Sequence, residues 1–179
     1  MSLNRKSFVL GAAIVFLASA AHAQFNPTGS TTLSVNVASE AAIQINTATT
    51  TLSTAGGAFS SSYTGQTSFT YKIRTGKTSG TGSITLQVTS DFGAGGPSVA
   101  SPASGDALTY TCTVTSPATA CAGSQTALTT GSTSVATFGA NSRSVKAGNT
   151  GSVSWTLPND SAYSTGAYNA TVTFTISAA

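Results

Sequence analysis

The chain has 179 residues, only 6% of them charged, and a formal net charge of +3. So few charges leave no basic surface of the size that nucleic acid binding requires. The single histidine, His22, lies in a segment that we expect to be removed. A Ser-His-Asp arrangement and most zinc sites are therefore excluded from the mature chain.

The first 23 residues have the features of a secretory signal peptide. Two basic residues precede an uncharged apolar run over 8–20, and residues 21–23 have the small-x-small pattern of a cleavage site. The apolar run is shorter than the roughly 20 residues of a membrane-spanning helix. We predict cleavage between Ala23 and Gln24 and release of the mature chain, without membrane attachment, through the periplasm. Five basic and four acidic residues then remain.

Apolar residues in the rest of the chain recur with a period of two. Alternation with many β-branched and aromatic residues is typical of half-buried antiparallel strands. Gly-, Pro- and Ser-rich turns separate the alternating segments. We predict an all-β fold over 38–179, an immunoglobulin-like antiparallel β-sandwich of about seven or eight strands with inward-facing Trp155; a jelly roll is the alternative. In chain order the segments are 31–37, 43–45, 68–74, 83–89, 107–115, 151–157 and 168–176.

The two cysteines, Cys112 and Cys121, have eight residues between them. Cys112 shares the parity of the inward residues of its segment, and Cys121 lies in the segment leaving that strand. Export to an oxidising compartment makes a disulfide the default. Such a bridge contributes about 2–3 kcal/mol in the chain-entropy model. Free thiols or a metal pair are the alternatives.

The four carboxylates of the mature chain are far apart in sequence. No spacing suggests the facing pair of a glycosidase, and no Asp-x-Asp pattern suggests a calcium site. Asp106 and Asp160 occupy ordinary turn positions. We therefore predict no catalytic, cofactor or metal site, and a protein that is not an enzyme. The four residues are Glu40, Asp91, Asp106 and Asp160.

One basic cluster stands out, formed by Lys72, Arg74 and Lys77. Its simplest interpretation is a set of solvated charges that protect a strand surface from aggregation. Contact with an acidic polysaccharide or with a neighbouring subunit is the alternative.

Residues 24–37 form a candidate N-terminal arm. The arm begins with a Pro- and Gly-containing stretch and ends in the alternating apolar residues Leu33, Val35 and Val37. Most predicted strands carry only Thr and Ser on their outer face, so their edges lack the charges that block edge-to-edge pairing. A free segment with alternate apolar residues is what strand addition requires. We predict that the arm is a donor strand and that the protein is a structural subunit of a secreted surface fibre.

Both chain ends resemble those of a known family. Residues 32–37, Thr-Leu-Ser-Val-Asn-Val, running on into Ile43-Gln44-Ile45, resemble the start of chaperone–usher pilins of the spore coat protein U-like kind. Residues 166–176 look like the closing strand of these pilins, a Gly-x-Tyr followed by alternate apolar residues. These pilins often carry a cysteine in the first strand, whereas here both cysteines lie in the middle of the chain.

The resemblance implies an incomplete immunoglobulin-like fold in a pilus or fimbrium that serves cell adhesion. Each subunit would lend its arm to the next, after passing a periplasmic chaperone and an outer-membrane usher. The donor positions would be Leu33, Val35 and Val37. An acceptor groove would be lined by Val172, Phe174 and Ile176.

A secreted adhesin or carbohydrate-binding module is the alternative function. It predicts a row of exposed aromatic side chains, for which the loops offer Tyr63, Phe92 and Tyr163. A hydrolase is disfavoured by the lack of histidine and of a carboxylate pair.

Overall fold

The computed structural model describes residues 28–57, 59–102 and 105–179. The predicted signal peptide and its cleavage site between Ala23 and Gln24 lie outside these residues. The chain divides after Val35, and residues 36–179 form one compact unit.

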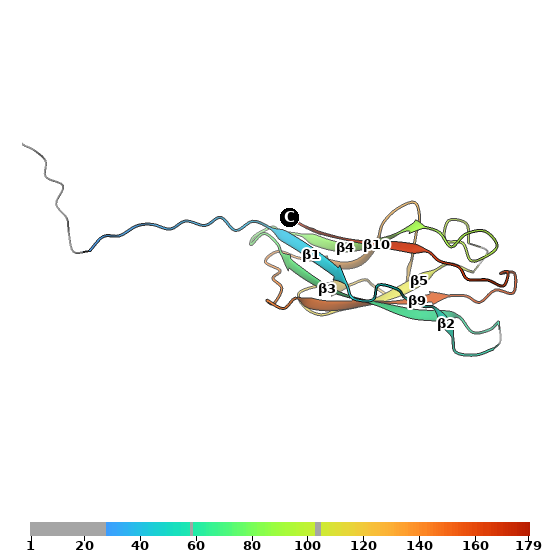
Figure 1. Cartoon of the computed structure of the whole chain (residues 1–179). Helices are drawn as coiled ribbons and strands as arrows, with labels where there is room; N and C mark the ends of the chain where they lie inside the picture. The colour runs from blue at the N-terminus through green and yellow to red at the C-terminus, as the bar shows by residue number, and fades with distance from the viewer. Residues whose placement is uncertain (1–27, 58, 103–104) are drawn as a thin grey trace, which may run out of the picture. The chain divides into compact units, whose positions relative to one another are not determined.

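Two antiparallel sheets build this unit, as the sequence predicted (Figure 1). The larger sheet has the strand order β1-β3-β9-β5-β7, with β2 paired to β3, and the smaller has the order β10-β4-β8-β6. The described part of the chain is an all-β sandwich. Its strands are β1 (Glu40–Ile45), β2 (Ser53–Thr54), β3 (Tyr63–Arg74), β4 (Gly82–Ser90), β5 (Thr109–Val114), β6 (Thr119–Ala120), β7 (Gln125–Thr126), β8 (Thr133–Phe138), β9 (Asn149–Leu157) and β10 (Thr171–Ala178).

The core lies between the two sheets and contains the predicted inward rows. Successive side chains of a strand point to opposite faces, so every second residue of each central strand reaches the core. Trp155 is buried, as its parity predicted. The central rows are Phe69, Tyr71 and Ile73 of β3, Ile84, Leu86 and Val88 of β4, and Val153, Trp155 and Leu157 of β9.

Strand β8 was not predicted, and its burial pattern explains why. Val135 and Ala136 are adjacent in sequence, yet both are fully buried. The register between β4 and β8 shifts between Ile84 and Thr85, which is the signature of a bulge or irregularity. An extra residue at such a point interrupts the alternation of inward and outward side chains, so no period of two is visible there.

The two chain ends differ from the prediction. Residues 28–39 belong to no strand, although 31–37 alternate, and β10 begins at Thr171 rather than at 168. A strand requires a neighbouring strand to accept and donate its backbone hydrogen bonds. Alternation alone therefore does not make residues 31–37 a strand in a single chain.

Candidate assembly site: an exposed arm and an open sandwich edge

One side of the sandwich is bounded by two edge strands that do not pair with each other. Among the strands of the described residues, β1 pairs only with β3, and β10 pairs only with β4. β1 and β10 nevertheless pack against each other across the sandwich. On its far side β10 has no strand partner among the described residues, so it presents a row of backbone N–H and C=O groups to any incoming strand.

The inward side chains of β10 are only half buried. Val172, Phe174 and Ile176 lie at the core face, and all three keep part of their surface exposed. Their partners on the neighbouring strand β4 are Val88, Leu86 and Ile84, which are 0–1% exposed. The apolar layer is therefore fully buried at β4 and partly exposed at β10.

The facing edge strand is incomplete in the same way. Ala41 and Ile43 of β1 are half buried against the core, and Ile45 is exposed. The ring of Phe174 lies 5.9 Å from that of Phe69 on β3, centroid to centroid. This contact joins β10 to the opposite sheet. We call Val172, Phe174, Ile176, Ala41 and Ile43, with the free backbone of β10, the open edge.

The outer face of β10 carries no charge. Its outward residues alternate with the half-buried row and are all exposed hydroxyl side chains. Two of them bond to the neighbouring strand: Thr173 Oγ1 lies 3.1 Å from Thr89 Oγ1, and Ser177 Oγ lies 3.1 Å from Ser83 Oγ. Natural sheets usually guard such an edge with Lys, Glu or Pro. This edge has none of them.

The opposite side of the sandwich is closed covalently. Cys112 on β5, in the larger sheet, forms a disulfide with Cys121, which directly follows β6 of the smaller sheet, and their Cα atoms are 5.6 Å apart. The backbone N–H of Cys121 donates to the Val135 carbonyl at 3.0 Å. The predicted disulfide is confirmed, and it is compatible with an oxidising, extracellular environment.

The apolar side chains of the arm lie in solvent. Leu33, Val35 and Val37 are 91%, 87% and 58% exposed. Three large apolar side chains at alternate positions of an unpaired segment are unusual, because burying each one would gain about 1.5–3 kcal/mol.

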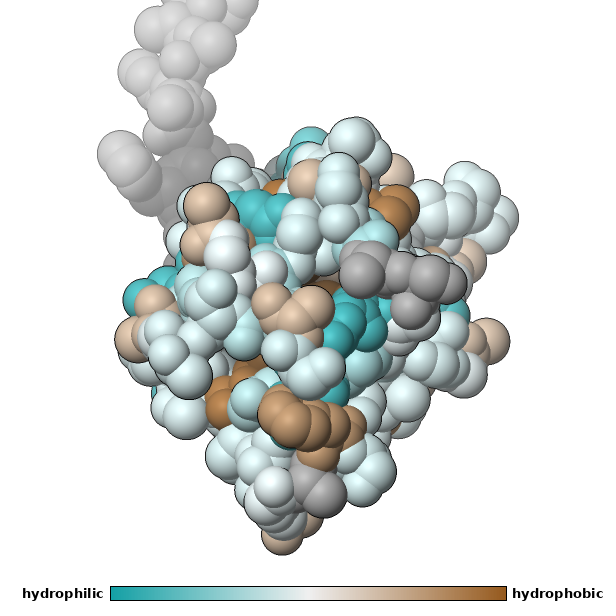
Figure 2. Space-filling view, turned by 90° about the vertical axis from the view of Figure 1, so that its right-hand side faces the viewer, coloured by the Kyte–Doolittle hydropathy of each residue, from teal (hydrophilic) through white to brown (hydrophobic). Residues whose placement is uncertain are grey.

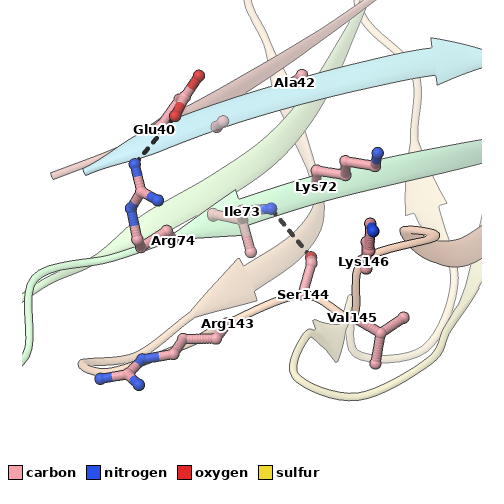
Figure 3. Close-up of a pocket in the computed structure, with 10 residues that line it drawn as sticks. Glu40, Ala42, Lys72, Ile73, Arg74, Arg143, Ser144, Val145 and Lys146 are labelled. Atoms are coloured by element: carbon pink, nitrogen blue, oxygen red, sulfur yellow. Dashed lines mark hydrogen bonds and ion pairs between the residues drawn. The ribbon is translucent and has the colours of Figure 1, made fainter. Parts of the chain in front are cut away.

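The base of the arm, in contrast, is held by Arg74. The Arg74 Nε donates to the carbonyl of Ala38 at 2.7 Å, and an Nη pairs with the Glu40 carboxylate at 3.0 Å. Figure 3 shows the guanidinium of Arg74, on β3, turned toward Glu40 at the start of β1. The chain is therefore bonded to β3 at Ala38, the residue that directly follows Val37.

The predicted basic cluster is part of a larger one. Lys72 and Arg74 line a pocket of about 430 Å³ together with Arg143 and Lys146 (Figure 3). Lys77 lies in the nearby loop between β3 and β4. Sequence reasoning missed Arg143 and Lys146 because they are some 70 residues from β3; an isolated β-bridge between Arg74 and Arg143 brings the segments together.

Asp106 and Asp160, interpreted from the sequence as turn residues, both make hydrogen bonds in loops. Asp106 accepts a hydrogen bond from the hydroxyl of Tyr163 at 3.0 Å, and Asp160 accepts one from the N–H of Ala162 at 2.8 Å. Burial together with the nearby Asp106 carboxylate raises the pKa of Tyr163. The Tyr163–Asp106 bond ties the loop before β5 to the loop before β10, and the Asp160–Ala162 bond lies within the latter loop.

Asp91 has the densest set of partners. It accepts hydrogen bonds from the N–H groups of Phe92, Val99 and Ala100 and from the Ser98 hydroxyl. Burial alone would raise the pKa of Asp91, but these hydrogen bonds outweigh it and hold the pKa below its usual value. The carboxylate therefore organises the loop that follows β4.

The three aromatic residues considered for ligand binding do not form an exposed row. Tyr63 is the first residue of β3, and both it and Phe92 pack partly against the core. Tyr163 is half buried and bonded to Asp106. Figure 2 shows the end of the sandwich where the loops before β5 and β10 lie: its surface is mostly of intermediate hydropathy, and its apolar areas are separate from one another.

The described residues contain neither a metal-binding cluster nor a membrane-spanning helix. No group of three or more His, Cys, Asp or Glu side chains within them is placed to hold a metal ion. No helix in that part of the chain is long and apolar enough to span a membrane.

Comparisons with protein-family models, with curated proteins and with solved structures found no match for this chain.

Proposed function

We propose that the protein is a structural subunit of a secreted surface fibre, in which the arm of one copy is added as a strand to the open edge of the next. The observation that carries this proposal is the coexistence of two unsatisfied apolar rows in one chain. Leu33, Val35 and Val37 are exposed on the arm, and the row on β10 is half buried. Each row supplies what the other lacks.

The two rows also match in length. Both place three apolar residues at alternate positions over five residues, from 33 to 37 in the arm and from 172 to 176 in β10. A strand lying beside β10 would satisfy its free backbone groups, and its alternate side chains would point into the incomplete core layer. Burial of three such side chains, at about 1.5–3 kcal/mol each, favours a long-lived contact.

The predicted signal peptide and the disulfide support a route to the cell surface. A cleaved signal peptide would deliver the chain to the periplasm, where Cys112 and Cys121 can be oxidised. An open edge exposed before assembly is an aggregation hazard. A periplasmic chaperone and an outer-membrane usher, the partners implied by the resemblance to pilins, would cover that edge until the next subunit arrives.

The arm is tested with two double variants that carry the same charges, one on the apolar row and one at the positions between its members. Leu33→Asp/Val35→Asp places charges on the apolar row, and Ser34→Asp/Asn36→Asp places the same charges between its members. All four positions are exposed, so both mature chains should unfold at the wild-type denaturant midpoint. We expect the first variant to remain monomeric in light scattering and electron microscopy, and the second to form heat-resistant polymers like the wild type.

The open edge is tested by complementation. Val172→Asp should block acceptance, whereas Thr173→Asp, on the outer face of the same strand, should not. A chain with the charged arm can still accept the arm of another copy at its open edge. A chain with the charged edge can still donate its own arm. Mixing the two should therefore yield a dimer and no longer polymer. A wild-type chain that never polymerises, or polymers indifferent to the charged arm, would overturn the proposal.

A further inference from the structure

The positively charged side chains of the described residues gather at one end of the sandwich. Lys72 and Arg74 lie in the last three residues of β3, and Lys77 follows in the β3–β4 loop. Arg143 is bridged to Arg74, and Lys146 stands three residues before β9, whose first residue pairs with Tyr71 near the end of β3. We call this the basic end. Glu40, paired with Arg74, is the one acidic side chain of the described residues there, and Ala179 lies at the same end, where its backbone oxygen accepts a hydrogen bond from the N–H of Gly76 at 3.1 Å.

The other three carboxylates gather at the opposite end. Asp91 directly follows β4, Asp106 precedes β5, and Asp160 follows β9. Tyr163 bonds to Asp106, and Ser164 N–H donates to the carbonyl of Gly95 at 2.8 Å, so the three loops form one group. We call this the acidic end. It is the right-hand end of the sandwich in Figure 1, and the start of β1 marks the left-hand, basic end.

The two ends are too far apart to interact within one molecule. Eleven residue steps separate Tyr63 from Arg74 along β3, a distance of about 36 Å at roughly 3.3 Å per residue. This is several times the Debye length of about 8–10 Å at moderate salt. The separated charges therefore act only on what comes close to each end from outside.

The arm is connected to β1 at the basic end of its own subunit, and this connection limits which end of the next subunit that basic end can meet. Val37 is three residues from Glu40, the first residue of β1 at the basic end, so about 10 Å of chain joins them. If a donated arm runs antiparallel to β10, Val37 finishes beside the start of β10, at the acidic end of the acceptor. If it runs parallel, Val37 finishes beside the end of β10, at the acceptor's basic end.

We infer that the basic end of each subunit docks on the acidic end of the next copy, which an arm running antiparallel to β10 permits. The inference rests on the proposed function and adds to it a second contact surface between subunits, matched in charge. The opposite orientation would press two basic ends together within about one Debye length. Complementary charges also accelerate association, by 10- to 1,000-fold in favourable cases.

The test compares variants that change net charge equally at different places. Arg143→Ser/Lys146→Ser removes two positive charges from the basic end, where neither side chain has a hydrogen-bond partner in the described structure. Thr111→Glu/Thr113→Glu changes the net charge by the same amount at exposed positions of β5, which pair with Ser154 and Ser152 of β9, away from both charged ends. Circular dichroism and the unfolding midpoint verify that each variant folds.

The acidic end has its own matched pair. Ser161→Lys/Thr165→Lys adds two positive charges in the exposed loop before β10 and leaves Asp106 and Asp160 in place. Thr111→Lys/Thr113→Lys adds the same charges on the face of β5. The measured quantity is the initial rate of polymer formation by mature chain, at about 50 mM and about 500 mM salt.

We expect both end variants to polymerise at least about tenfold more slowly than their β5 controls at low salt, with the difference vanishing at high salt. Faster assembly of Arg143→Ser/Lys146→Ser would show that basic ends meet each other, and would overturn the inference. Rates equal to those of the β5 controls would overturn it while leaving the fibre intact. A wild-type chain without arm-dependent polymers would remove both proposals.

Discussion

The indole Nε1 of Trp155 donates a hydrogen bond to the hydroxyl oxygen of Thr67, 2.9 Å away, and both side chains are buried. The Thr67 hydroxyl lies 2.6 Å from that of Thr50, in the segment between β1 and β2. The core thereby accommodates its one tryptophan without leaving the indole N–H unpaired.

Thr67→Val should destabilise the fold although it preserves shape. The substitution removes the partner that the Trp155 N–H has among the described residues, and a buried donor without an acceptor costs about 1–3 kcal/mol. Trp155 is the only tryptophan of the chain, so urea unfolding can be followed by its fluorescence. Thr156→Val, at an exposed position of β9, is the control and should change stability by less than about 0.5 kcal/mol. Equal effects would show that the bond contributes nothing.

Removal of the disulfide should weaken the closed side of the sandwich. Cys112→Ala/Cys121→Ala restores the freedom of the loop in the unfolded chain, and we expect a loss of about 2–3 kcal/mol of unfolding free energy. Reductant should lower the unfolding midpoint of the wild type by a similar amount and leave the double variant unaffected. A wild type insensitive to reductant under unfolding conditions would contradict the prediction.

The β3–β4 turn should not accept a side chain at Gly80. A Cβ at this position would collide with backbone atoms of Gly76, which cannot move aside as a side chain can. The Gly80 N–H also donates to the Gly76 carbonyl at 3.3 Å. We expect Gly80→Ala to cost about 1–3 kcal/mol in thermal or urea unfolding. Gly131→Ala, where nothing lies within 4 Å, should have little effect.

Stability should fall in acid through Asp91. Its folded pKa lies below the ordinary value of 3.8, so the carboxylate stabilises the fold above that pH, and this contribution is lost as the pH falls through the folded pKa. Asp91→Asn cannot titrate. The variant should be less stable than the wild type at pH 7, and the difference should shrink below about pH 4. A stability difference that stays constant between pH 7 and pH 3 would contradict this assignment.

The inward rows of the central strands could be predicted because they depend on a local rule. In β3, β4 and β9 the alternation of apolar and polar residues continues without a break, so parity alone identified Tyr71, Leu86 and Trp155 as core. In β8 the adjacent buried residues Val135 and Ala136 hid the strand, because an irregularity in pairing with β4 is a property of two strands and not of one.

The open edge and the charged ends could be predicted only in part. Alternation identified Val172, Phe174 and Ile176 as one face of a strand, but not that this strand lies at the edge of its sheet. Lys72 and Arg74 are close in sequence, whereas Arg143 joins them only through a bridge between distant segments.

The sequence by itself determined the strands with an unbroken period, the disulfide pair and the alternating arm, because each depends on spacing along one chain. Tertiary structure decided which strands lie at the edges, which apolar rows stay incomplete, and that opposite charges collect at opposite ends. The physical reason is that an edge, an unfinished core layer and a charged end are made by the packing of two sheets, and no single segment contains that information.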